Sequence, residues 1–262
     1  MIKNNISKNQ NLIANQLSDL PITVTWLKQV DSTNTYAKQH FQAQQYQSII
    51  LAGSDVQTHG YGKQKRYFIS NSGGVYLSLI AKVPHLTTSN QGLLTTGTAW
   101  CLHQTIRQQF NTISDIKWVN DLLLHGKKIA GILIEKIATQ TVIIGIGCNL
   151  YQPNLEQALA SSTNVLDYPP TTEQFCKFVA QLVRKLMSFI PNFTQEQFLY
   201  DYEKNMSMLG QKVTAITGKK AITGKKAITG DAVRLDNQAN LILNNHGQLV
   251  TINSGEVLKI RQ

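Results

Sequence analysis

Apolar and polar positions along the first part of the chain follow the periods of strands and helices in turn. The alternation in residues 23–30 predicts a strand, and the polar tetrapeptide DSTN predicts a turn and then a helix over residues 34–45. Apolar runs at residues 48–54 and 75–81 predict buried strands. The long polar, glycine-containing stretch 55–74 between them is typical of a functional loop.

A core helix is predicted next. Residues 91–110 carry apolar side chains at helical spacing, namely Leu94, Ala99, Leu102, Ile106 and Phe110. Four strand-like runs follow, DIKWV, DLLL, KKIAGILIE and QTVIIGIGCNL, and we expect them in the middle of a sheet. Two further helices are predicted around residues 173–189 and 195–206, and short strands with turn signals begin at Gly210.

The change of pattern near Leu209 divides the chain. We predict a larger domain over residues 1–209, which begins with a polar N-terminal extension at residues 1–22, and a small β domain over residues 210–262. The small domain contains a perfect repetition, AITGKK at Ala215 and Ala221 and AITG again at Ala227. Three short copies are too few for a solenoid, so we interpret them as a duplication that lengthens one hairpin rather than as a binding motif.

Composition narrows the class of protein. A chain of 262 residues with 42% hydrophobic residues can bury a full core, and its apolar stretches fall far short of a membrane span. The polar N-terminus lacks the features of a secretory signal, so we expect a soluble cytoplasmic protein. Three cysteines in apolar contexts favour buried reduced thiols. The six histidines lack metal-site spacing, and we expect them at the surface or in loops.

The formal charge of +10 is compatible with nucleic acid, an acidic partner or an anionic substrate. Four of the lysines belong to the repeat, and several others lie in residues 55–74 and 115–135, where we expect phosphate to bind. An anionic substrate therefore explains the charge better than a dedicated nucleic-acid surface.

Polar groups converge at strand ends within residues 115–135, DIKWVNDLLLHGKKIAGILIE. Asn120 and Asp121 offer oxygens suited to Mg²⁺ or a ribose, and Lys117 and Lys128 offer charges suited to carboxylate and phosphate oxygens. An enzyme that activates a carboxylate with ATP requires this set of groups. Taken alone, the segment fits a hairpin turn with ordinary flanking charges equally well.

The loop SDVQTHGYGKQKRYFISNSGG combines glycines with Lys63, Lys65 and Arg66 and the aromatic pair Tyr67-Phe68. Glycines let backbone N–H groups approach an anion, and cations can balance the charge that develops on an α-phosphate during adenylyl transfer. Closure of such a loop would exclude water from a mixed anhydride. Taken alone, a solvated flexible loop explains this segment better.

Six motifs in order along residues 24–261 resemble those of the biotin–protein ligase family. DSTN is similar to the family's STN, GYGKQKRYFIS to GRGRxGRxW, KWVND to KWPND, KKIAGILIE to KxxGILxE, GIGCN to GxGxN, and SGEVLKIR to SGEvsLR. Each motif is weak alone, and their common order makes the resemblance specific.

The resemblance implies an α+β catalytic domain with a mixed β-sheet and flanking helices, as in biotin and lipoate ligases and class II aminoacyl-tRNA synthetases, followed by a small SH3-like β-barrel. It implies an ATP-dependent ligase that forms biotinyl-5′-AMP, with Mg²⁺, and transfers biotin to a lysine of a biotin carboxyl carrier protein. Family members that repress transcription carry an N-terminal winged helix, whereas here the first predicted strand begins near Thr23. We therefore expect no DNA partner and no membrane partner, and a homodimer is compatible with the resemblance.

The resemblance also implies site residues. Biotin contacts are carried over to Ser32, Thr33, Asn34, Gln57, Gly60, Tyr61, Gly62, Lys63, Lys128, Gly131 and Gly145. ATP and adenylate contacts are carried over to Arg66, Phe68, Lys117, Asn120, Asp121, Asn149 and Arg261, with Asp121 as the metal ligand. Lys128 and Arg66 are the candidate catalytic cations, because the biotin carboxylate is itself the nucleophile and needs no general base. No histidine in a motif is an obvious base for the transfer step.

The loop departs from the family pattern at several positions. Tyr61 and Lys63 replace two arginines, Lys65 replaces a glycine and Phe68 a tryptophan, and in KWVND Val119 replaces a proline. The loss of one charge and of bidentate geometry predicts weaker retention of the adenylate. Two other functions stay open, a lipoate- or octanoate-handling relative on the same fold and a non-catalytic biotin-binding sensor.

Overall fold

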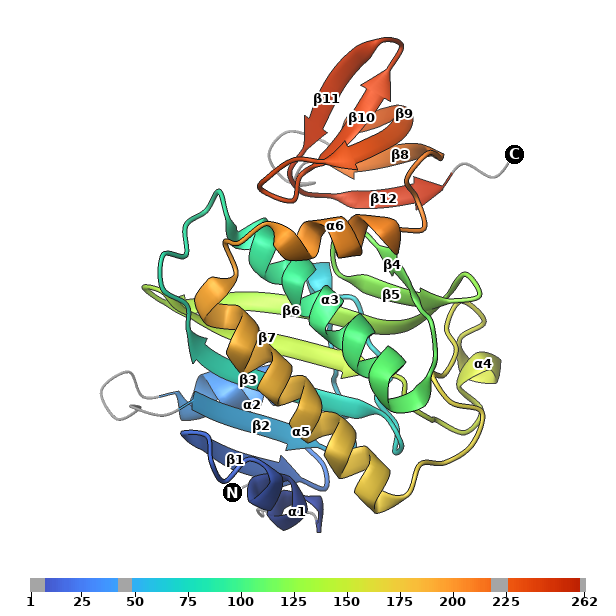
Figure 1. Cartoon of the computed structure of the whole chain (residues 1–262). Coiled ribbons are helices and arrows are strands. Elements are labelled where there is room, and N and C mark those ends of the chain that lie inside the picture. Colours follow the sequence, from blue (N-terminus) through green and yellow to red (C-terminus); the bar gives the residue numbers. More distant parts are fainter. Residues whose placement is uncertain (1–7, 42–48, 218–225, 260–262) are drawn as a thin grey trace.

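The computed structural model describes residues 8–41, 49–217 and 226–259, and its centre is a mixed sheet of seven strands (Figure 1). In spatial order these strands are β1 (Ile22–Leu27), β2 (Ile49–Ser54), β3 (Val75–Lys82), β7 (Thr141–Cys148), β6 (Lys127–Ala138), β5 (Asp121–Leu124) and β4 (Asp115–Lys117). The pair β1 and β2 is parallel, and the other neighbouring strands are antiparallel. The prediction of an α+β fold with a mixed sheet is therefore confirmed.

Helices cover both faces of this sheet. The described helices are α1 (Asn9–Gln16), α2 (Thr33–His40), α3 (Gln91–Phe110), α4 (Leu155–Ala158), α5 (Thr172–Phe189) and α6 (Gln197–Lys204), with short 3-10 turns η1 (Lys63–Lys65) and η2 (Ile190–Asn192). Figure 1 shows α3 and α5 side by side on one face, and α2 lies on the other. Because side chains of a strand alternate, Leu79 of β3 joins the α3–α5 core and Ile80 joins the core beneath α2.

Helix α5 shows how local sequence produces these elements. The Thr171 hydroxyl accepts a hydrogen bond from the Gln174 backbone N–H, and the Gln174 side chain accepts one from the Thr171 N–H, which forms a capping box. Buried residues then recur at helical spacing from Phe175 to Phe189, so one face of the helix fills the core.

Residues after α6 form a second sheet of five antiparallel strands. Their spatial order is β11 (Gln248–Ile252), β10 (Leu241–Asn245), β9 (Lys226–Leu235), β8 (Lys212–Thr217) and β12 (Glu256–Lys259). His246 and Gly247 both have positive φ and join β10 to β11 in a tight hairpin. The predicted C-terminal β region is therefore present, while the domain boundary and an SH3-like closure stay predictions.

The described parts of the sequence repeat lie on two paired strands of this second sheet. Its first copy begins in β8 and its third copy in β9, and these two strands pair, with Ala215 opposite Ile228. Most of the second copy lies outside the described residues. Hydrogen bonds join the second sheet to the preceding part of the chain: for example, Trp118 Nε1 donates to the Ala239 carbonyl over 2.8 Å, and the Leu235 N–H donates to Glu203 Oε1 over 2.5 Å.

Helix α1 lies in the segment that we expect to be a polar extension. It buries Ile13 and Leu17 in the core, and the Gln10 side chain accepts a 3.0 Å hydrogen bond from the Trp26 N–H on the edge strand β1. Two buried apolar residues in a segment rich in Asn and Gln are too weak a periodic signal for a sequence-based prediction. The described part of the extension is therefore a packed element that also covers the edge of β1.

Three expectations from composition can be compared with the structure. All three cysteines are free and buried, as predicted. No helix in the described ranges combines the length and the apolar character needed to cross a membrane. His103 is fully buried in α3, with Nδ1 2.9 Å from the Ser114 hydroxyl, so the expectation of a surface or loop histidine is wrong there because this helix is enclosed.

Candidate active site

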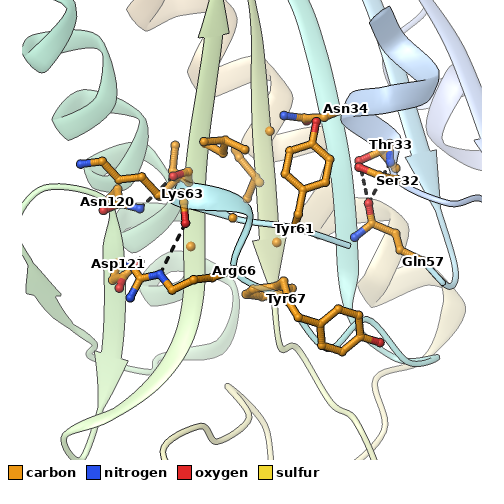
Figure 2. A pocket seen from close by; sticks show the side chains of 18 of the residues that line it. Ser32, Thr33, Asn34, Gln57, Tyr61, Lys63, Arg66, Tyr67, Asn120 and Asp121 are labelled. Atoms are coloured by element: carbon orange, nitrogen blue, oxygen red, sulfur yellow. Dashed lines mark hydrogen bonds between the residues drawn. The ribbon is translucent and has the colours of Figure 1, made fainter. Parts of the chain in front are cut away.

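A pocket lies on the central sheet beneath the polar loop, with a volume of about 650 Å³ that includes its open mouth (Figure 2). Its lining comes from the start of α2, the loop, the corner before β5, and strands β6 and β7. The lining includes these predicted site residues: Ser32, Thr33, Asn34, Gln57, Tyr61, Gly62, Lys63, Arg66, Phe68, Asn120, Asp121, Lys128, Gly131 and Gly145. The fold thus brings together residues that lie more than one hundred positions apart in the sequence.

One end of the pocket carries an uncharged hydrogen-bond network. Gln57 Oε1 accepts from the Thr33 N–H over 2.8 Å and from the Thr33 hydroxyl over 3.1 Å, and Gln57 Nε2 donates to Ser70 Oγ over 2.9 Å. The Ser78 hydroxyl lies 2.9 Å from Thr33 Oγ1 and 2.5 Å from Asn34 Oδ1. Each of these side chains is buried, so their mutual bonds hold this wall in one conformation.

Two glycines of β7 make room for this arrangement. A Cβ atom on Gly145 would lie 2.2 Å from Asn34 Oδ1, and one on Gly147 would lie 2.7 Å from Phe68 Cε1. Asn34 and Phe68 therefore rest directly on the strand backbone, which only glycine allows at these two positions.

A charged cluster stands beside the uncharged network. Glu135 Oε1 accepts from Lys38 Nζ over 2.7 Å, and Glu135 Oε2 accepts from Asn34 Nδ2 over 2.8 Å and from the Tyr61 hydroxyl over 3.1 Å. Lys38 Nζ also donates to the Tyr61 hydroxyl over 3.2 Å. Burial opposes ionisation of Glu135, but the hydrogen bonds from Lys38 and Asn34 hold its pKa below the ordinary value.

The loop over the pocket is a narrow, twisted hairpin. The Phe68 N–H donates to the Gly60 carbonyl over 2.9 Å, and the Gly62 N–H donates to the Arg66 carbonyl over 2.8 Å, with Tyr61 opposite Tyr67 between them. Gly60 packs closely against the uncharged network, because a Cβ there would lie 2.5 Å from Ser70 Oγ and 2.8 Å from Gln57 Nε2. The hairpin geometry directs Tyr61 across the pocket, while Tyr67 is exposed and points away from the other labelled side chains (Figure 2).

The opposite end of the pocket is charged. Lys128 Nζ lies 2.7 Å from Asp121 Oδ1 and 5.9 Å from the centre of the Phe68 ring. Asn120 closes the corner before β5, because its side chain donates to the Ile132 carbonyl and its carbonyl accepts from the Ile132 N–H, both over 2.9 Å. A Cβ on Gly131 would come within 3.0 Å of Lys128 Nζ, so this glycine leaves space for the lysine head group.

Two loop cations extend this charged end toward the second sheet. Lys63 Nζ donates to the Gly255 carbonyl over 3.4 Å, and Arg66 forms a 2.8 Å ion pair with Glu256, the first residue of β12. Burial lowers the pKa of the Lys63 ammonium, and Arg66 adds to this effect while Asp121 and Glu256 oppose it. The Arg66–Glu256 pair is largely exposed, and we expect it to stabilise the fold very little.

Three of the predicted site residues that the structure describes, Gly60, Lys117 and Asn149, do not line the pocket. Gly60 packs against the uncharged network, and Lys117 lies on the edge strand β4. Asn149 is buried, and its side chain donates to the Lys128 and Thr163 carbonyls and accepts from Gln152, so it braces the strand that carries Lys128. Arg261 lies outside the described residues. Ligand contacts by these residues stay predictions.

Sequence reasoning also missed part of the lining. The missed residues are Tyr67, Ile132, Leu133, Ile146 and Gly147, which are sequence neighbours of motif residues. Lys38 and Glu135 were missed as partners of the site. Lys38 follows Asn34 by one helical turn, and Glu135 ends the KxxGILxE pattern. Helix periodicity and the motif could therefore have placed these two residues near the site.

A metal ion would find few protein ligands here. In the part of the chain that the structure describes, no group of three or more His, Cys, Asp or Glu side chains could hold a metal ion. Asp121 offers a single carboxylate at the charged end of the pocket. Mg²⁺ usually binds through one or two carboxylates together with substrate phosphates, so Asp121 fits a metal that arrives with a nucleotide but not a metal bound by the protein alone.

Comparisons with known proteins agree with the fold. Residues 26–149 match the biotin/lipoate A/B protein ligase family. The bifunctional ligase/repressor BirA of Bacillus subtilis is 41% identical over 110 residues, which cover 40% of this chain and 34% of that protein. The biotin–[acetyl-CoA-carboxylase] ligase of Mycobacterium tuberculosis is 29% identical over 148 residues, 56% of this chain and 53% of that protein. The chain thus matches between about a third and a half of the length of these relatives.

A solved structure extends the similarity over the whole fold. The biotin protein ligase of Aquifex aeolicus in complex with biotin and ATP has a TM-score of 0.75 and 24% identity, and covers 91% of this chain and 99% of that chain. The fold and the pocket define a mixed-sheet α+β ligand-binding domain with a second β-sheet at its C-terminal end. Over residues 26–149 the chain is similar to the biotin/lipoate A/B protein ligase family, which confirms the resemblance of its motifs.

Proposed function

We propose that this protein is an ATP-dependent ligase that forms biotinyl-5′-AMP from biotin and ATP and transfers biotin to a lysine of a biotin carboxyl carrier protein. The observation that carries the proposal is one pocket with two chemically different ends. The uncharged end, built on Thr33, Asn34 and Gln57, suits a neutral polar head group, and the charged end, with Lys128 and Arg66, suits a carboxylate and phosphates.

The first step needs alignment rather than a base. A carboxylate oxygen of biotin attacks the α-phosphorus of ATP, a new P–O bond forms, and the bond to the β-phosphate oxygen breaks as pyrophosphate leaves. Negative charge grows on the oxygens around the α-phosphorus, and a cation fixed in advance stabilises that charge most effectively. Lys128 suits this role because its ammonium group is fixed at the charged end by a 2.7 Å ion pair with Asp121 Oδ1.

Arg66 and Lys63 supply further positive charge from the loop. Both point toward the charged end in Figure 2, and both are held by groups of the second sheet, through Glu256 and the Gly255 carbonyl. When Mg²⁺ accompanies ATP, Asp121 is the residue that would hold it, and the ion would neutralise phosphate charge. The protein residues alone would bind, orient and shield the reactants.

The second step requires access for a protein lysine. The lysine nitrogen attacks the acyl carbon of the mixed anhydride, the acyl–oxygen bond to AMP breaks, and the amine proton is lost. A wide hollow of about 1940 Å³, which includes open solvent, adjoins the pocket and shares Lys63, Asn120, Ile132 and Leu133 with it. This hollow supports the proposal of a second, macromolecular substrate, and the base that takes the proton stays unassigned.

Pyrophosphate release with biotin and ATP, followed by biotin incorporation into a purified carrier domain, tests the proposal. Lys128→Gln should reduce pyrophosphate release by at least about 100-fold, because removal of one preorganised donor to a developing charge has that effect. Lys127→Gln is the matched control, because the neighbouring Lys127 pairs with Glu156 and does not line the pocket. Equal activity of the two variants would refute the role of Lys128.

The same assay separates the rival functions. The family that matches residues 26–149 includes lipoate ligases, so lipoate is offered in parallel with biotin. Pyrophosphate release with lipoate but not with biotin would show that lipoate, rather than biotin, is the substrate. Biotin binding without any pyrophosphate release would favour a non-catalytic sensor.

A further inference from the structure

Tyr61 makes more specific contacts than a wall residue of a pocket requires. Its hydroxyl donates to Glu135 Oε2 over 3.1 Å and accepts from Lys38 Nζ over 3.2 Å. The Lys38 and Lys65 ammonium groups also lie 5.7 and 4.9 Å from the centre of its ring. Two cations near the ring and a hydrogen bond from its hydroxyl to a carboxylate together favour a single orientation of the side chain.

The contacts of Tyr61 connect the loop to the rigid part of the fold. Tyr61 belongs to the loop hairpin, Glu135 lies on β6 and Lys38 lies on α2. The return arm of the hairpin has its own anchor, because Ser70 Oγ donates to the Phe68 carbonyl over 2.9 Å and is bonded in turn to Gln57. Tyr61 therefore ties the outward arm across the pocket, and its ring passes between the two ends (Figure 2).

The same carboxylate joins the loop to the substrate end. Glu135 Oε2 accepts both from the Tyr61 hydroxyl and from Asn34 Nδ2, so a shift of the loop alters a hydrogen-bond partner of Asn34. The Glu135 side chain is 23% exposed, which makes these bonds stronger than they would be in water. Opening of the loop thus requires the loss of the hydrogen bonds that the Tyr61 hydroxyl makes with Lys38 and Glu135, which lie beside Asn34.

We propose that Tyr61 is a positioning residue that latches the loop over the bound organic acid through Glu135 and Lys38, and so slows release of biotin and of the adenylate. This inference rests on the proposed function and names how that site keeps its ligand. The arginine that Tyr61 replaces in the family motif would carry its own charge. The Tyr61 hydroxyl instead forms hydrogen bonds with both members of the Lys38–Glu135 ion pair. The latch therefore opposes the weaker retention that the altered loop predicts.

The test compares Tyr61→Phe with Tyr200→Phe. Tyr61→Phe removes the hydroxyl and leaves the ring, and Tyr200→Phe makes the same change on α6, where Lys204 Nζ lies 4.1 Å from the ring centre, far from the pocket lining. Radiolabelled biotin bound to the full chain is chased with excess unlabelled biotin, and release is followed over time. We expect about tenfold faster release from Tyr61→Phe, the effect of losing a hydrogen bond to a charged group, and no change from Tyr200→Phe.

A general structural defect would give a different pattern. For the latch, the urea midpoint of Tyr61→Phe stays at the wild-type value, kcat for pyrophosphate release changes less than about twofold, and KM for biotin rises. Adding Glu135→Gln to Tyr61→Phe should speed release no further than the faster single variant, because Tyr61→Phe removes the donor of this bond and Glu135→Gln removes the charge of its acceptor. Wild-type release rates in Tyr61→Phe would overturn the latch even if the protein forms the adenylate. A wild-type chain that binds no biotin would overturn the proposed function and the latch together.

Discussion

Replacement of Gly145 by alanine is expected to disrupt the uncharged end of the pocket from beneath. The new Cβ atom would lie 2.2 Å from Asn34 Oδ1 and 2.8 Å from its Cγ and Nδ2, too close for any small adjustment. Asn34 would have to leave the strand, and would lose its bonds to Glu135 and to Ser78. A hydrogen bond to a charged group and one to a neutral group together contribute roughly 2–4 kcal/mol, so we expect that loss of unfolding free energy.

Urea unfolding and calorimetric titration with biotin check this prediction. Gly62→Ala is the control for stability, because its Cβ would meet only the Arg66 carbonyl at 3.9 Å and its φ of −114° suits any residue. We expect the control within about 0.5 kcal/mol of wild type. The reasoning is refuted if Gly145→Ala unfolds within that same margin and binds biotin with unchanged affinity.

Two further predictions concern the core and the junction of the two sheets. Burial raises the pKa of the Cys101 and Cys148 thiols to about 12 and that of Cys176 to about 11, so iodoacetamide at pH 8 should label none of them in the folded protein and all three in urea. Rapid labelling of the folded protein, read by intact mass, would contradict this. Trp118→Phe removes the buried hydrogen bond to the Ala239 carbonyl and should lower the unfolding free energy by about 1–3 kcal/mol. A change below about 0.3 kcal/mol in urea unfolding would show that this bond does not stabilise the junction.

Elements with a strong hydrophobic period could be predicted closely from the sequence. The helix predicted over residues 91–110 is α3 (Gln91–Phe110), and the four predicted middle strands pair in one continuous part of the sheet. The strand predicted to reach Val30 ends earlier, because β1 stops at Leu27 and Val30 makes a single bridge to Gln57. Helices α1 and α4 escaped prediction because they bury too few apolar residues to show a period.

Some residues of the candidate site could likewise be predicted from the sequence, and others could not. Motif residues such as Asn34, Asp121 and Lys128 do converge, because Asp121 and Lys128 lie on the paired strands β5 and β6, and Asn34 lies on α2, which contacts the next strand, β7. Lys127 and Lys128 are adjacent in sequence, but their side chains lie on opposite faces of β6. Lys127 pairs with Glu156, and Lys128 lines the pocket. In the sequence, only the motif distinguishes the two lysines. Asn149 belongs to a motif too, but its buried amide bonds to backbone carbonyls rather than lining the cavity.

Contacts made by the second sheet are the part of the site that no local pattern could reveal. Trp118 fixes the corner that carries Asn120 and Asp121 through a hydrogen bond to a residue 121 positions later, and Arg66 pairs with Glu256, 190 positions later. The corner and the loop approach the charged end of the pocket from different elements, and both contacts reach the same small sheet. The second sheet therefore contacts both the loop that carries Arg66 and the corner that carries Asp121, while the central sheet holds the same loop through Phe68, which rests on Gly147 of β7.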